Sequence, residues 1–199
     1  MDPTPPAQGD WPVFPPPRCG RCNFGSRAFS RPEAAGLLRE SAARWQQVLT
    51  DPDTTGQRVG ALSWSPLEHG CHVRDMCLLF HQRLDAVLGP SAAAPGAGEP
   101  AAAPAEFPVL YRDEDPGRAA EELGRAAEEL ARRLERLTGD DWDRGDTRFP
   151  GARLTVDFFT RHLLHDIVHD LCEVLRAGRR AGGNTAPGSG PRREKERSS

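Results

Sequence analysis

Four segments of this chain repeat their apolar residues with the period of an α-helix, and a helix-starting signal precedes each one. The first begins after Ser30. The second begins after Ser65, which forms a predicted capping box with Glu68 and has proline at the first helical position. The third begins at Asp115-Pro116 and the fourth after Thr155. Because no segment has a convincing strand pattern, the sequence predicts an all-α four-helix bundle.

Low-complexity segments set the expected domain limits. Residues 1–17 are rich in proline, and residues 178–199 are rich in glycine, serine, arginine and proline, so both are predicted to be disordered tails. We expect the fourth helix to end at Arg176, before Gly178, which makes 18–177 the bundle domain. The stretch Pro90–Pro108 is mostly alanine, glycine and proline. It predicts a long crossover connection between the second and third helices.

Composition excludes several classes of function. The net charge of −3 gives no basic surface for nucleic acid, and no stretch approaches the roughly 20 apolar residues of a membrane span. The first 30 residues lack the apolar region of a secretory signal, so we expect a cytoplasmic protein. Its five cysteines are then expected to be thiols. A homodimer is left open.

Histidine spacing indicates where chemistry is located. Three of the six histidines lie between residues 162 and 169, and His165 and His169 are four apart, on one face of the fourth helix. His72 lies on the inner stripe of the second helix. A bundle that brings these faces together places His72, His165 and His169 around one divalent metal with an open coordination position. Glu68, one turn before His72, is a candidate hydrogen-bond partner for its imidazole. The alternative is a metal-free core with hydrogen-bonded histidines.

A second motif, Cys19-x-x-Cys22, lies before the first helix. Three interpretations remain open at this point. The pair can be a small packing loop with free thiols, a second metal element completed by other residues, or a redox dithiol.

Two segments resemble the signature segments of the DinB/YfiT-like superfamily: Trp64–Asp75 and Thr160–Leu171. The Cys-x-x-Cys element resembles an actinobacterial subgroup of it. The resemblance covers residues 18 to 176. It implies a DinB-like four-helix bundle with a long crossover, and a divalent metal held by His72, His165 and His169. Asp170 stands where close relatives often carry another histidine, but it lies off the predicted ligand face.

The resemblance also implies an activity. Characterised relatives are mycothiol-dependent maleylpyruvate isomerases and mycothiol or bacillithiol S-transferases. We therefore expect a divalent metal (zinc, or nickel or another ion) and mycothiol or a similar low-molecular-weight thiol. The ion would lower the thiol's pKa, and the thiolate would attack a small electrophile in detoxification or catabolism. Arg161 is a candidate for binding a substrate carboxylate, or for a structural ion pair. His162 is a candidate for supporting a metal ligand through a hydrogen bond, or for a proton shuttle.

A function of another class fits the same residues: a non-catalytic metal- or ligand-binding bundle, linked to stress response. The two differ in the metal's coordination shell. An open position beside a pocket favours an enzyme, whereas a fourth protein ligand, such as His162 or Cys172, favours a structural site.

Overall fold

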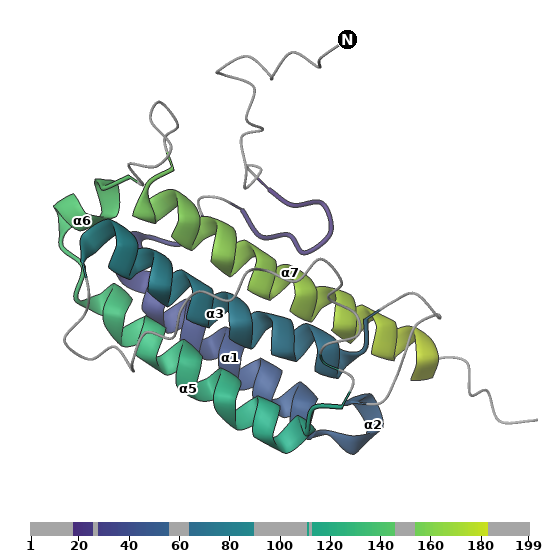
Figure 1. Ribbon diagram of the computed structural model, residues 1–199. Helices are drawn as coiled ribbons and strands as arrows, with labels where there is room; N and C mark the ends of the chain where they lie inside the picture. Colours follow the sequence, from purple (N-terminus) through teal and green to yellow (C-terminus); the bar gives the residue numbers. More distant parts are fainter. Residues whose placement is uncertain are drawn as a thin grey trace, which may run out of the picture.

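The computed structural model describes residues 18–25, 28–55, 64–89, 111, 113–145 and 154–182. In these residues it is a bundle of four long helices without a strand, as expected (Figure 1). The long helices are α1 (Ala34–Thr50), α3 (Pro66–Leu88), α5 (Pro116–Glu135) and α7 (Val156–Gly182). A 3₁₀ turn (Arg31–Glu33) precedes α1, and the short helices α2 (Pro52–Thr55) and α6 (Gly139–Asp143) follow α1 and α5.

The predicted capping residues start the helices. Ser65 and Glu68 form the capping box of α3: the Ser65 amide donates to Glu68 Oε2 at 2.7 Å, and the Glu68 amide donates to Ser65 Oγ at 3.2 Å. The side chain of Asp115 caps α5, and Thr155 Oγ1 accepts from the Phe158 amide at the start of α7. Each cap satisfies an amide that the first turn leaves without a partner.

One predicted helix end was wrong. We expected the fourth helix to stop before Gly178, but α7 continues to Gly182, so the first five residues of the predicted tail are helical. A glycine ends a helix when it adopts a left-handed conformation, as Gly89 does after α3 with φ of 91°. Gly178 does not have a positive φ. The predictions for residues 1–17, 90–108 and 183–199 lie outside the described residues.

Two ion pairs show how α3 and α5 are oriented relative to each other. Arg74, early in α3, pairs with Glu122, early in α5, and Asp85, late in α3, pairs with Arg133, late in α5. Helices α3 and α5 are therefore parallel neighbours. The connection between them must return along the length of the bundle, because a 20-residue helix is about 30 Å long. The parallel direction of these two helices agrees with the long crossover expected from the sequence, whose own residues lie outside the described ones.

Helix α7 packs beside α1 and α3. The indole of Trp45, fully buried on α1, donates to the carbonyl of Ile167 on α7 at 3.2 Å. On the other side, the Arg83 guanidinium of α3 lies over the ring of Phe159, with its carbon 3.9 Å from the ring centroid. Helix α7 is therefore held on two flanks. No helix within the described residues has the length and apolar character needed to cross a bilayer.

Candidate metal centre

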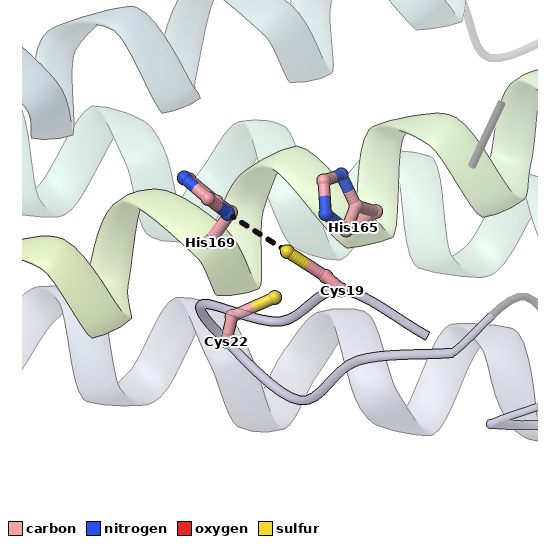
Figure 2. A group of neighbouring side chains, drawn as sticks. All are labelled: Cys19, Cys22, His165 and His169. Atoms are coloured by element: carbon pink, nitrogen blue, oxygen red, sulfur yellow. Dashed lines mark hydrogen bonds between the residues drawn. The ribbon is translucent and has the colours of Figure 1, made fainter. Parts of the chain in front are cut away.

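The histidine pair lies on α7 as its spacing predicts. His165 is buried and His169 half-buried, and their ring centroids are 5.3 Å apart. Both imidazoles project from the same side of the helix (Figure 2). The four-residue spacing produces this arrangement, because it turns the helix through about 400°.

A loop of residues 18–25 lies along this side of α7 (Figure 2). The Cys19 amide donates to the Phe24 carbonyl at 2.7 Å, and the Asn23 amide donates to the Cys19 carbonyl at 2.9 Å. Asn23 has a φ of 65°, a left-handed conformation that asparagine tolerates better than most residues. Phe24 is buried, with its ring centroid 5.9 Å from that of His165. The turn therefore faces both cysteines toward the histidines.

The two motifs meet in one group. A ligand atom from each of four side chains lies within 4.8 Å of the other three: Cys19, Cys22, His165 and His169. Within this group, Cys19 Sγ lies 3.5 Å from His169 Nδ1. Two thiols and two imidazoles are ligands that zinc prefers. The structure thus favours the second interpretation of the cysteine pair, a metal element completed by other residues.

Asp166 orients one of the histidines. Its Oδ1 lies 3.0 Å from His165 Nδ1, and its Oδ2 lies 3.1 Å from His162 Nε2. Burial raises the pKa of Asp166, but the hydrogen bonds from His162 and His165 outweigh burial and hold the pKa below its ordinary value. A carboxylate on Nδ1 leaves Nε2 as the nitrogen that His165 can offer to an ion. His162 therefore contacts the carboxylate that orients the candidate ligand His165, as expected of a residue that supports the ligands without binding the ion.

The two cysteines of the loop differ in acidity. The pKa of Cys19 is lowered to about 5, first by the hydrogen bond from His165 and then by backbone hydrogen bonds from Cys22 and Arg21. Burial raises the pKa of Cys22. Burial also raises the pKa of Cys71 and of Cys77 to about 12. Cys19 is therefore a thiolate near neutral pH, the form that binds metals.

This difference predicts selective alkylation of the metal-free, folded protein. Cys19 is expected to react with iodoacetamide at a rate that stays near its plateau down to about pH 6 and falls as the pH drops through about 5, because only the thiolate reacts. Cys71 and Cys77 should stay unmodified. Mass spectrometry of tryptic peptides measures each rate. Equal rates for Cys19 and Cys22 at pH 6 would contradict the prediction, since the pKa of Cys22 is raised.

His72 is not a member of the four-residue group. It is half-buried on α3, with its ring centroid 5.2 Å from that of Trp64. Burial lowers its pKa, and the charge of Asp170 on α7 opposes that effect. Asp170 also lies 3.5 Å from His69 Nδ1. Two of the three expected ligands, His165 and His169, are thus brought together with the cysteines, and the assignment of His72 stays a prediction.

The other candidate site residues, Glu68 and Arg161, form contacts that stabilise the fold. Glu68 closes the capping box of α3, and its role as a partner of His72 stays a prediction. Arg161 donates to Asp157 at 2.9 Å and to the Phe29 carbonyl at 3.2 Å, and its guanidinium lies over the Phe29 ring. These contacts match the ion-pair alternative for Arg161. They also hold the segment before α1 against α7.

Sequence reasoning did not identify Asp166 as a partner of His165, and it did not join the two motifs. The Cys-x-x-Cys pair by itself supplies only two of the four ligands of a structural zinc site. The available signal was the ligand count, since one Cys-x-x-Cys and one His-x3-His make four ligands.

Comparison with known proteins supports part of this picture. A sequence model of the DinB superfamily matches residues 51–171 of the chain. The matched residues include His72, His165 and His169, whereas Cys19 and Cys22 precede the match. Searches of curated proteins and of solved structures found no match to this chain.

Proposed function

Because the chain belongs to the DinB superfamily, we propose that it is a metal-binding four-helix bundle protein in which a zinc ion has a structural role. One observation carries the proposal: four ligand atoms, each within 4.8 Å of the others, come from Cys19, Cys22, His165 and His169.

The distances fit a tetrahedral ion. Zinc binds sulfur at about 2.3 Å and imidazole nitrogen at about 2.0–2.1 Å, so a sulfur and a nitrogen on one ion lie about 3.5 Å apart. Cys19 Sγ and His169 Nδ1 are separated by 3.5 Å. All pairs of the group lie within 4.8 Å, so the other pairs need to approach by at most about 1.5 Å to reach tetrahedral spacing. Thiolate ligands favour zinc over magnesium or calcium, which prefer oxygen.

The number of ligands indicates a structural role. Catalytic zinc sites use three protein ligands and keep one position for water or substrate, whereas structural sites use four. Four protein ligands leave no position for a thiol cofactor. The non-catalytic alternative therefore has more support than the enzyme.

The ion would hold the loop of residues 18–25 to α7. This loop has no helix of its own, and within the described residues its backbone hydrogen bonds are all local, joining Cys19 to Phe24, Asn23 to Cys19 and Ala28 to Gly25. Coordination contributes folding free energy to segments that cannot bury enough apolar surface. The metal would thus add to the long-range contacts that the loop makes with α7 through Phe24 and Arg21.

A second candidate is a metal-dependent S-transferase or isomerase that uses mycothiol or a similar thiol and a small electrophile. The observation that favours it is exposure: Cys19, Cys22 and His169 are only partly buried. If one cysteine left the ion, a cofactor thiol could take its position and ionise there. Arg161 and His162 would then both stand about one turn before His165 on α7.

Cobalt substitution tests the proposal. The zinc-free protein is loaded with Co²⁺, and its absorption spectrum is recorded with and without added imidazole or 2-mercaptoethanol. We expect intense visible bands of tetrahedral cobalt and a thiolate charge-transfer band in the near ultraviolet. Because four protein ligands fill the shell, neither additive should change the spectrum.

A spectrum that shifts with a saturable dependence on 2-mercaptoethanol would overturn the structural role and support the thiol-using enzyme. A spectrum without the thiolate band would exclude the cysteines as ligands.

A further inference from the structure

A pocket of about 620 Å³ lies beside the metal centre. It is bordered by the loop of residues 18–25, the ends of α1 and α2, the start of α3 and the last turns of α7. Its volume is in the range of small-molecule sites, about 300–1,000 Å³. The metal ligands do not line it. It is therefore a separate site from the four-residue group.

One wall of the pocket is apolar. Val48, Pro66 and Val174 are buried side chains of α1, α3 and α7, and Trp64 stands half-buried next to Pro66. The Trp64 ring lies against His69, with centroids 5.4 Å apart. Such a wall fits an aromatic or alkyl body, because burial of apolar surface is favourable and aromatic rings add edge-to-face contacts.

The pocket also has cationic lining residues. Three arginines line it, Arg21, Arg176 and Arg179, with Glu173 as the one carboxylate among the described lining residues. Arg21 and Arg176 share that carboxylate, at 3.6 Å and 3.8 Å. Charge-assisted hydrogen bonds between arginine and carboxylate are shorter, about 2.7–2.9 Å. The three arginines thus have N–H donors and a net positive charge with which to bind a second anion.

We propose that this pocket binds a small organic carboxylate with an apolar body. The carboxylate contacts Arg176 and Arg21, and the body lies against Trp64 and Val174. An organic cation is disfavoured by three guanidinium groups, and arginine's planar fork matches a carboxylate. The position of Arg21 rests on the proposed metal, because Arg21 stands between the ligands Cys19 and Cys22.

The test uses the full chain loaded with zinc and titrated calorimetrically with 2-naphthoate. We expect saturable binding that is at least about tenfold weaker for Arg176→Gln, and at least about tenfold weaker when uncharged 2-naphthalenemethanol replaces the naphthoate. Arg44→Gln is the matched control, since Arg44 is an exposed arginine on α1 that pairs with Glu40 and does not line the pocket. Circular dichroism verifies that each variant is folded.

Absence of saturable binding, equal affinity for the acid and the alcohol, or equal weakening by Arg176→Gln and Arg44→Gln would each overturn the carboxylate site. Metal analysis of the same samples separates this result from the proposed function. If the chain holds no zinc but binds naphthoate with the expected dependence on Arg176, the metal proposal fails and the pocket stands. If zinc is present, its removal should weaken naphthoate binding, because Arg21 loses its fixed position.

Discussion

Replacing Cys22 with serine is expected to reduce bound zinc from one equivalent per chain to less than about 0.1 after dialysis against a weak chelator. Structural zinc sites bind with about 10–16 kcal/mol, so each of four ligands contributes on the order of 3 kcal/mol, or about 100-fold in affinity. Cys19→Ser and His169→Ala should have the same effect, because their ligand atoms belong to the same group. Elemental analysis of the dialysed proteins measures the stoichiometry.

Two further variants distinguish the proposed ligand set from the alternative ligands. Cys172→Ser is the matched control: Cys172 is a half-buried thiol on α7 near Cys22, but it lies outside the group, and its loss should leave zinc unchanged. His72→Ala separates the two ligand sets. If His72→Ala loses zinc while Cys19→Ser and Cys22→Ser retain it, the three-histidine site implied by the family resemblance is correct and the Cys₂His₂ site is wrong.

Chelation of the metal is expected to lower the melting temperature by about 10 °C. An ion that binds only the folded state stabilises it by about 4 kcal/mol when its free concentration is 1,000 times the dissociation constant. For a chain of 199 residues, each kcal/mol shifts the melting temperature by about 2–4 °C. Differential scanning calorimetry with and without a strong chelator measures the shift, and added zinc should reverse it.

The Cys22→Ser variant supplies the control for this measurement. It should melt near the temperature of the chelated wild-type protein, and the chelator should not lower that temperature further. A wild-type protein that loses its zinc and melts unchanged would contradict a structural role, since the ion would then contribute nothing to folding.

Local signals predicted most of the helices. Ser65 and Glu68, Asp115 and Thr155 each start a helix in the structure, because a cap acts through atoms within three or four residues. The same reasoning missed α6, although Thr138 and Asp141 form a capping box for it. The segment after Thr138 is rich in glycine and aspartate and has no helical repeat of apolar residues. Its helix is only five residues long, and the buried ring of Trp142 packs in the core.

The candidate site, like the fold, was predictable from the sequence only in part. The shared face of His165 and His169 follows from helical geometry, which depends on spacing alone. The identity of their partners depends on which distant segment packs beside α7. Cys19 is 150 residues from His169 along the chain, and no periodicity relates them. The helical period indicates which side chains lie on the inner faces of two helices, and it selected His72 for that reason. It gives no information on where a loop without regular structure packs.

The helix-forming periodicity, the caps and the histidine spacing were thus readable in the linear chain, because each depends on interactions within one or two turns. The direction of each helix, the return of the chain between α3 and α5, and the meeting of Cys19 and Cys22 with α7 came from packing. Those features depend on contacts between residues far apart in the chain, such as Arg133 with Asp85, Trp45 with Ile167 and Phe24 with His165.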